Sequence, residues 1–274
     1  MKEQSLITQI EVVVCSHVNT WMGLLPQRLR ASCAELGLAR NLKLSLGEDA
    51  LIILFDIDDT LLDHSAAMRL AAACLHANLR LDVSKEDFLA AWQGALNHYY
   101  PLYLKGEITY ESARRARIRK TIDPGLADQE ADQLFATYLA VYETAWTLFP
   151  DVLSCLDRLA SFRMGIISNG RASEQRKKLT RFGLANRFDH VLLSEDCGFA
   201  KPDQEIFRSA CKAMGVLPAK AIYVGDQYQI DACGARSAGL IGIWLDRQGN
   251  ASDHHDPPVM RSLDELVPVE NLGA

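Results

Sequence analysis

Five short apolar runs, alternating with segments of helical periodicity, constrain the fold more than any other feature of this sequence. The runs are LIILF (51–55), MGIIS (164–168), HVLLS (190–194), AIYVG (221–225) and IGIWL (241–245). Their hydrophobicity is continuous, as in parallel strands that are covered on both faces. Helical periodicity separates the later runs, over 152–162, 173–183, 204–214 and 228–238. Strands that alternate with helices predict an open, doubly wound α/β sheet.

A long insertion without a strand-like run separates the first apolar run from the second. Its periodicity predicts four helices, over 64–81, 85–99, 109–121 and 127–147. We expect this helical domain, 63–148, to lie over the strand ends as a lid. The sheet domain would then comprise 50–62 and 149–274. Residues 1–49 form an extension of unclear role, in which Trp21, Leu25, Leu29, Cys33 and Leu36 have helical spacing.

Composition excludes two classes of partner. The chain has 274 residues and a net charge of −6, so it offers no basic face for nucleic acid. No apolar run approaches the roughly 18 residues of a membrane span. Seven cysteines without a C-x-x-C pair lie in apolar stretches, which is typical of a reducing compartment. We find no secretory signal pattern and expect a cytoplasmic protein. The sequence does not predict the oligomeric state.

The segments that follow the first four apolar runs are where we expect the chemistry, because ligands of such sheets bind beyond the carboxyl ends of the strands. They read DIDDT (56–60), SNG (168–170), SEDCGFAKPD (194–203) and GDQYQID (225–231). Asp56 and Asp226 are expected to face each other across adjacent strand ends. Clustered carboxylates without histidine or thiolate are typical ligands of a hard divalent cation, above all Mg²⁺. Such a cation relieves their repulsion and attracts phosphate.

The residue types at these strand ends suit phosphoryl transfer. A carboxylate beside Mg²⁺ can attack phosphorus and form an aspartyl-phosphate. Asp58 points the same way along an extended chain, so it can protonate the leaving oxygen and later deprotonate the attacking water. Lys201, Ser168 and nearby backbone N–H groups are candidates to hold the phosphoryl oxygens. Because Pro202 favours a first helical position, we expect Lys201 at a helix N-terminus, which attracts anions.

Each assignment has a plainer alternative. Asp56 and Asp58 could form an acidic turn at a strand end, and Ser168 could cap the turn that follows it. Lys201 could be a solvated surface lysine, and Asp231 an acid on a helix surface. We interpret three neighbours as structural or solvent-facing, namely Asp59, Thr60 and Asp63. The Thr60 hydroxyl is expected to contact the turn backbone.

The order D-x-D-x-T, S-N-G, K-P and G-D-x-x-x-x-D resembles the motifs of the haloacid dehalogenase-like (HAD) hydrolase superfamily. The resemblance covers about 50–245 and includes a helical insertion with the position and length of the first cap subclass. It implies a Rossmann-like core with an inserted α-helical cap, and Mg²⁺-dependent hydrolysis of phosphomonoesters. It also implies that Asp56 is the nucleophile and Asp58 the general acid and base. The phosphate-binding residues that it implies are Ser168, Asn169 and Lys201.

The resemblance further implies a metal site. Asp226 would supply a metal carboxylate, together with Asp56 and the main-chain carbonyl of Asp58. Asp231 would orient Lys201 or the water shell of the metal. Gln227 departs from the small hydroxyl residue that is often found at its position, and we expect altered contacts around the site rather than a disabled one.

The inserted helices hold the candidates for substrate recognition. The segment LYLKGEITYESARRARIRK (102–120) looks like part of the caps of nucleotidases and sugar-phosphate phosphatases. Arg117, within its arginine run, and His64, just after the first motif, are the candidate specificity residues. The alternative for the arginines is a solvated helix face.

These observations favour a phosphatase for a small soluble phosphomonoester, such as a nucleoside 5′-monophosphate or a sugar phosphate. A 2-haloacid dehalogenase uses the same nucleophile on carbon, but it needs neither Mg²⁺ nor the second aspartate of the first motif, so Asp58 argues against it. A third alternative is a non-catalytic protein that binds a phosphate ligand. The intact set of Asp56, Asp58, Lys201 and Asp226 argues against this alternative. The sequence does not predict which phosphomonoester is the substrate.

Overall fold

The computed structural model describes residues 12–14, 42–45, 52–251 and 256–269. Contacts between residues divide them into two compact units. One unit, which we call the cap, is Leu61–Phe149. The other, which we call the core, contains the described residues on either side of the cap in the sequence.

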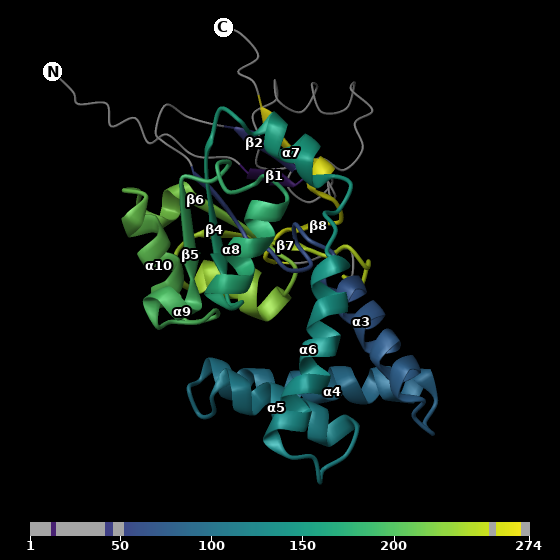
Figure 1. The fold of residues 1–274 in the computed structure, drawn as a ribbon. Coiled ribbons are helices and arrows are strands. Elements are labelled where there is room, and N and C mark those ends of the chain that lie inside the picture. The colour runs from purple at the N-terminus through teal and green to yellow at the C-terminus, as the bar shows by residue number, and fades with distance from the viewer. Residues whose placement is uncertain (1–11, 15–41, 46–51, 252–255, 270–274) are drawn as a thin grey trace, which may run out of the picture. The chain divides into compact units, whose positions relative to one another are not determined.

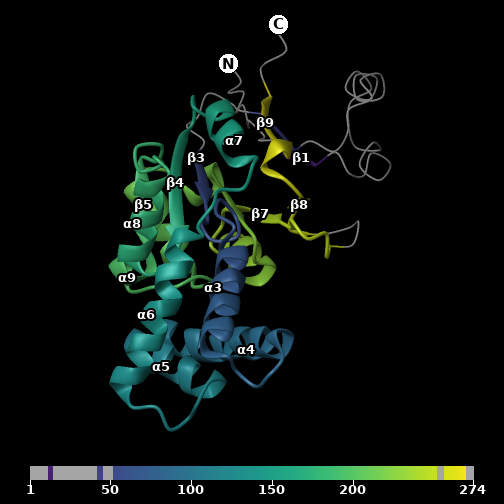
Figure 2. The same ribbon diagram turned by 45° about the vertical axis from the view of Figure 1, so that its right-hand side comes forward.

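The core is built on a six-stranded, fully parallel sheet (Figure 1). In spatial order the strands are β5 (His190–Leu193), β4 (Arg163–Ser168), β3 (Ile52–Phe55), β6 (Ala221–Gly225), β7 (Ile241–Leu245) and β8 (Val259–Met260). The first five coincide with the five apolar runs, which confirms the predicted α/β sheet. The sequence did not reveal β8, a two-residue strand beyond β7 (Figure 2).

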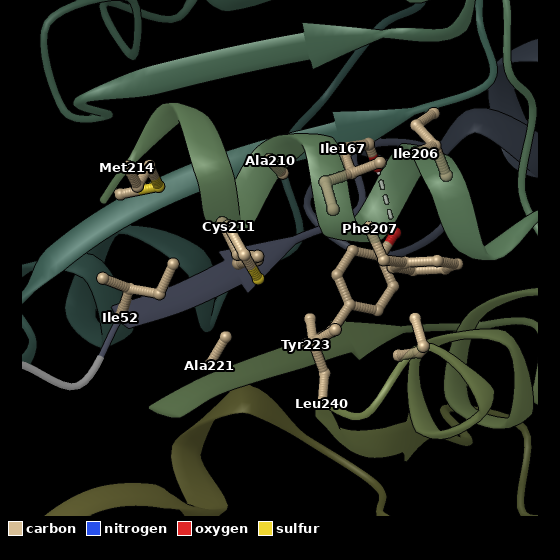
Figure 3. Close-up of a cluster of buried hydrophobic side chains, with 13 residues drawn as sticks. Ile52, Ile167, Ile206, Phe207, Ala210, Cys211, Met214, Ala221, Tyr223 and Leu240 are labelled. Atoms are coloured by element: carbon tan, nitrogen blue, oxygen red, sulfur yellow. Dashed lines mark hydrogen bonds between the residues drawn. The ribbon is translucent and has the colours of Figure 1, made fainter. Parts of the chain in front are cut away.

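Helices connect these strands, as the alternating pattern predicts. They are α7 (Val152–Arg158), α8 (Ala172–Arg181), α9 (Ser194–Cys197), α10 (Gln204–Ala213), a π-helix (Tyr228–Cys233) and α11 (Gly234–Ser237). Short 3₁₀ turns occupy Pro218–Lys220 and Leu263–Glu265. Because side chains alternate along a strand, Ile52 and Leu54 face the same side of the sheet. That side packs against α10, whose Phe207 meets the ring of Tyr223 edge to face (Figure 3).

A second sheet has three strands, β1 (Val12–Val14), β2 (Leu42–Ser45) and β9 (Leu266–Val269). β2 pairs with β1 in antiparallel and with β9 in parallel fashion. No strand was predicted in 1–49, and the pairing of β2 with β9, more than 200 positions away, leaves no local signature in the sequence. The helical spacing that begins at Trp21 lies outside the described residues.

The cap consists of the four predicted helices, α3 (His64–Leu79), α4 (Lys85–Leu104), α5 (Tyr110–Thr121) and α6 (Asp128–Thr144). The side chains of Ser84 and Thr109 cap α4 and α5 by accepting hydrogen bonds from backbone N–H groups. α4 continues through Pro101, past its predicted end at residue 99, because a proline removes only its own N–H and the next turn closes onto the Pro101 carbonyl. Within the cap, α3 packs on α6 and α4 on α5 (Figures 1 and 2).

None of the helices in the described part of the chain combines the length and hydrophobicity that crossing a membrane requires. The described cysteines are free thiols, and two of them, Cys155 and Cys211, are buried in the core. Cys15 and Cys33 lie outside the described ranges.

Candidate active site

Three carboxylates meet at the carboxyl ends of the two central strands. Asp56 directly follows β3, and its N–H continues the ladder by donating to the Val224 carbonyl of β6 at 3.0 Å. Asp226 directly follows β6. Asp56, Asp226 and Asp231 each offer a carboxylate oxygen, and these oxygens lie within 4.8 Å of one another. The prediction that Asp56 and Asp226 face each other across adjacent strand ends is therefore confirmed.

Lys201 lies among these carboxylates as a buried cation. Its Nζ donates to Asp56 Oδ1 at 2.7 Å, to Asp231 Oδ1 at 2.7 Å and to the Tyr223 hydroxyl at 2.8 Å. Three donors meet three acceptors, so the ammonium group is fully hydrogen-bonded without water. The Tyr223 hydroxyl also lies 3.0 Å from the Ile167 carbonyl (Figure 3), which fixes its position between two strands. The alternative of a solvated surface lysine is wrong, because only 4% of Lys201 is exposed.

The loop that carries Lys201 is held by Asn169. The Asn169 side chain donates to the Lys201 carbonyl at 2.9 Å and accepts from the Lys201 N–H at 2.7 Å. Ser168 accepts a hydrogen bond from the Gly170 N–H at 3.2 Å, as a turn cap does, and it is buried. Both interpretations of Ser168 thus stay open.

The prediction that Pro202 opens a helix with Lys201 at its N-terminus is wrong. α10 begins at Gln204, and its N-cap is Asp203, whose side chain accepts a hydrogen bond from the Glu205 N–H. Aspartate is a strong N-cap residue, and it moves the start of the helix two residues beyond the proline. In this loop, Lys201 can therefore attract an anion through its own charge but not through a helix N-terminus.

Burial and like charge shift the protonation equilibria of these carboxyl groups. Burial raises the pKa of Asp56 to about 7; Asp231 and Asp58 also raise it, whereas Lys201 lowers it. Burial, then Asp231 and Asp56, raise the pKa of Asp226 well above its ordinary value. Burial alone would lower the pKa of Lys201, but Asp231 and Asp56 outweigh it and raise that pKa. One cation among several carboxylates leaves a local excess of negative charge.

A divalent cation would neutralise this excess of negative charge. One carboxylate oxygen of Asp226, Oδ1, is buried and has no hydrogen-bond partner in the described part of the chain. A buried acceptor without a partner is costly, and a metal ion can satisfy it. The donors are all hard oxygens, the ligand type that Mg²⁺ prefers. Trp244 holds the backbone here, since its Nε1–H donates to the Asp226 carbonyl at 2.8 Å.

Asp231, which belongs to the π-helix Tyr228–Cys233, supports the site through Lys201. In addition to the lysine, it accepts a hydrogen bond from the Gln227 N–H at 2.9 Å. A Cβ at residue 225 would lie 2.4 Å from Asp231 Cγ, so only glycine leaves room for this carboxylate. The alternative of a surface acid is wrong, because Asp231 is completely buried.

Asp58 is contacted by two side chains that the sequence analysis missed. Lys178 Nζ donates to Asp58 Oδ1 at 2.8 Å, and Gln175 Nε2 donates to Asp58 Oδ2 at 2.7 Å. Lys178 also lies 2.7 Å from Glu174 Oε1. Burial alone would lower the pKa of Lys178, but the two carboxylates raise it to about 12. The only signal in the sequence is two long polar residues one helical turn apart in the helix that follows S-N-G.

The turn after the first motif departs from one expectation. Thr60 Oγ1 is buried and lacks a hydrogen-bond partner among the residues that the structure describes, so the expected contact with the turn backbone is absent. Its carbonyl accepts instead from Arg247, which also forms a two-pronged ion pair with Asp151. Asp63 is the N-cap of α3 and accepts from the Ala66 N–H.

Within the cap, the two candidate specificity residues are both engaged with aromatic side chains. His64 Nδ1 lies 2.8 Å from the Tyr142 hydroxyl. Arg117 is buried, its Nε donates to the Trp92 carbonyl, and its guanidinium stacks 4.1 Å from the centre of the Trp92 ring. Arg117 Nη2 is buried without a hydrogen-bond partner in the described cap. Their role in specificity stays a prediction.

The other arginines of the α5 run bind carboxylates of α6 within the cap. Arg115 contacts both Asp128 and Asp132, while the other two contact one each. The partners are Asp132 for Arg114 and Asp128 for Arg119. These pairs give the run a role in holding the two helices together.

Comparison with known proteins gives consistent matches. Residues 51–239 match the profile of the hydrolases described as haloacid dehalogenase-like hydrolase. The glyceraldehyde 3-phosphate phosphatase of Methanopyrus kandleri is 31% identical over 73% of this chain and 85% of its own length. The HAD-hydrolase YfnB of Bacillus subtilis, solved with bound magnesium, superposes with a TM-score of 0.66 at 25% identity, over 80% of this chain and 97% of its own. A 2-haloacid dehalogenase from Pseudomonas syringae superposes with a TM-score of 0.59 at 30% identity, over 80% of this chain and 96% of its own.

Proposed function

Because the chain belongs to the haloacid dehalogenase-like hydrolase family, we propose that it is a Mg²⁺-dependent phosphatase that acts through an aspartyl-phosphate at Asp56. One observation carries this proposal, namely three carboxylates that converge around a single buried lysine. The likeness to a phosphatase of a small phosphorylated aldehyde supports it.

In the first step, Asp56 attacks the phosphorus of the substrate. Lys201 holds Asp56 Oδ1, so Oδ2 is the nucleophilic oxygen in this scheme. A bond forms between Oδ2 and phosphorus while the bond from phosphorus to the ester oxygen breaks, and Asp58 gives its proton to the departing alkoxide. The alcohol leaves, and the phosphoryl group stays on Asp56.

In the second step, water attacks the phosphorus of the aspartyl-phosphate. Asp58, now a carboxylate, takes a proton from this water. The bond between phosphorus and Asp56 Oδ2 breaks, and its electron pair regenerates the carboxylate. In both steps Ser168 and the Asn169 turn hold the phosphoryl oxygens, and Lys201, whose three N–H groups are already hydrogen-bonded, supplies positive charge beside them.

Asp56, Asp226 and the main-chain carbonyl of Asp58 are the ligands that we propose for Mg²⁺. When bound there, the ion would supply positive charge next to the phosphoryl oxygens, which lowers the cost of bringing two anions together. Lys201 alone leaves the group of carboxylates with excess negative charge, which is why we propose a second cation.

The substrate that we propose is a small phosphomonoester, either a sugar phosphate or a nucleoside 5′-monophosphate. Arg117 and His64 are our proposed specificity residues in the cap. The cytoplasmic location, and the expectation that neither nucleic acid nor a membrane is a partner, stay predictions from the sequence.

A 2-haloacid dehalogenase is the second candidate, since one such enzyme superposes on this chain. Substitution at carbon needs neither a metal ion nor a second carboxyl group in the first motif. Asp58, held by two buried side chains, and the unpartnered oxygen of Asp226 therefore favour phosphoryl transfer.

Hydrolysis of p-nitrophenyl phosphate with and without Mg²⁺ tests the proposal, with Asp56→Asn as the inactive control. We expect turnover in Mg²⁺ that EDTA abolishes. Dehalogenation of 2-chloropropionate without phosphatase activity would favour the second candidate. Binding of phosphate without either activity would identify a non-catalytic protein. If phosphatase activity is found, a screen of phosphorylated metabolites identifies the substrate.

A further inference from the structure

Helix α8 holds both carboxylate oxygens of Asp58. Oδ1 accepts from Lys178 and Oδ2 accepts from Gln175, two residues that lie one helical turn apart on the same face. Both donors are completely buried, whereas 24% of the Asp58 side chain is exposed. The partly exposed Asp58 carboxylate is therefore held on its buried side by two donors that solvent does not reach.

Glu174 completes this arrangement on the far side of Lys178. The lysine lies between the carboxylates of Asp58 and Glu174, at 2.8 Å and 2.7 Å. The Lys178 ammonium group is therefore tied to its own helix through Glu174 as well as to Asp58. The position of Asp58 is thus set by the position of α8.

Among the described residues, the contact between the Gln175 amide and Asp58 leaves the other amide atom of Gln175 without a partner. Its Nε2 donates to Asp58, while its Oε1 is buried and has no hydrogen-bond partner in the described part of the core. A buried polar atom without a partner is rare in folded proteins and calls for a functional reason. A hydrophobic side chain of the same size would avoid this cost if the residue only filled space.

Gly170 leaves the room that Gln175 needs. A Cβ at residue 170 would lie 1.7 Å from Gln175 Nε2 and 2.8 Å from its Cγ. Gly170 does not have the left-handed φ that would require glycine for backbone reasons. The glycine of the S-N-G motif is therefore needed for space, and that space is filled by the amide that contacts Asp58.

We infer that Lys178 and Gln175 are positioning residues, which hold the Asp58 carboxyl group where it exchanges a proton with the leaving oxygen and with water. This inference rests on the proposed function, in which Asp58 is the general acid and base. Each carboxylate oxygen has a second lone pair, so two donors orient the group without occupying its capacity for a proton. Both residues are completely buried, so they act through Asp58 and not on the substrate.

A purely structural role for Lys178 predicts a different result from a positioning role. If the lysine only anchors α8, its loss slows all substrates alike. If it acts through Asp58, its loss matters most where the leaving group needs a proton. Phenyl phosphate has a poor leaving group and p-nitrophenyl phosphate a good one, so these two compounds serve as the probes.

The test measures the rate of formation of phospho-Asp56 by rapid quench in Mg²⁺ for both probes. In Lys178→Met the rate with phenyl phosphate should fall by about 10²-fold, the usual scale of acid catalysis, with KM nearly unchanged. The fall with p-nitrophenyl phosphate should be about tenfold smaller. Lys178→Arg should restore part of the loss. The matched control is Lys177→Met, which removes an exposed lysine from the same helix and should leave both rates unchanged.

Two further variants keep the inference testable if Lys178→Met does not fold. Gln175→Met removes the second donor. Gly170→Ala displaces the Gln175 side chain although no residue of α8 is substituted. Both should show the same dependence on the leaving group. In the double variant Asp58→Asn with Lys178→Met, the rate should fall no further than in Asp58→Asn alone, because the two act as one unit.

Equal loss with both probes, or additive losses in the double variant, would overturn the inference while leaving the phosphatase intact. A wild-type protein that hydrolyses neither probe would overturn the proposed function and the inference together. The activity of the wild type therefore tells the two failures apart.

Discussion

In metal-free protein, a rise in pH from 5 to 8 is expected to lower the free energy of unfolding through Asp56. Burial raises the pKa of this carboxyl group from 3.8 to about 7. A folded state with the higher pKa binds its proton more tightly than the unfolded state does. The contribution of Asp56 to stability is therefore fully present below pH 3.8 and is lost as the pH rises towards 7.

The magnitude follows from the two pKa values. Each pH unit between them is worth about 1.4 kcal/mol, so the step from pH 5 to pH 8 costs about 2–3 kcal/mol. The pKa of Asp226 is raised for the same reason, which adds to the effect. Mg²⁺ requires ionised carboxylates, so the stabilisation that saturating Mg²⁺ provides should be larger at pH 8 than at pH 5 by at least this amount.

Urea unfolding at both pH values, in EDTA and in excess MgCl₂, measures this difference. Comparison with and without Mg²⁺ at the same pH removes the contributions of histidines and other groups that do not bind the metal. The control is Asp226→Asn, which should gain little or no stability from Mg²⁺. Equal stabilisation by Mg²⁺ at pH 5 and pH 8 would show that Asp56 does not have a raised pKa in the metal-free fold.

Three further results are expected. Ca²⁺ should suppress turnover in Mg²⁺, since it prefers more ligands at longer distances and can bind both oxygens of Asp56; kinetic competition between the two ions checks this. Asp58→Asn should slow an alkyl phosphate by roughly 10²–10⁴-fold, and with p-nitrophenyl phosphate should give a burst of phospho-enzyme followed by slow turnover; equal losses in the first step would contradict a role as general acid. Gly225→Ala should displace Asp231 from Lys201 and lower kcat by about 10²-fold, with an unchanged circular dichroism spectrum; full activity would show that the contact is dispensable.

The central strands and three of the site residues could be predicted because their signals are local. A strand that is covered on both faces needs a continuous apolar run, and the residue after it lies at the binding edge of the sheet. Asp56 and Asp226 follow directly from this rule, and Lys201 lies in the longer segment that follows β5. The four cap helices were likewise visible in their periodicity and in caps such as Ser84.

The contacts that the sequence did not reveal all depend on tertiary structure. Lys178 resembles the other basic residues of α8, and only the packing of that helix separates it from the exposed Lys177. Tyr223 reads as one more apolar residue of a strand, although its hydroxyl meets Lys201. Periodicity predicted the start of α10 at residue 204 correctly, but the first helical position expected for Pro202 was wrong, because Asp203 is the N-cap and the sequence does not show which of the two residues prevails.

Detection of a phosphoryl group on Asp56 tests the central claim most directly. The protein is mixed with p-nitrophenyl phosphate in Mg²⁺, quenched in acid within milliseconds and digested, and the peptide that contains Asp56 is weighed by mass spectrometry. We expect a phosphorylated Asp56 that accumulates in Asp58→Asn and is absent in EDTA. Rapid hydrolysis with no phosphorylated Asp56 in either protein would contradict it.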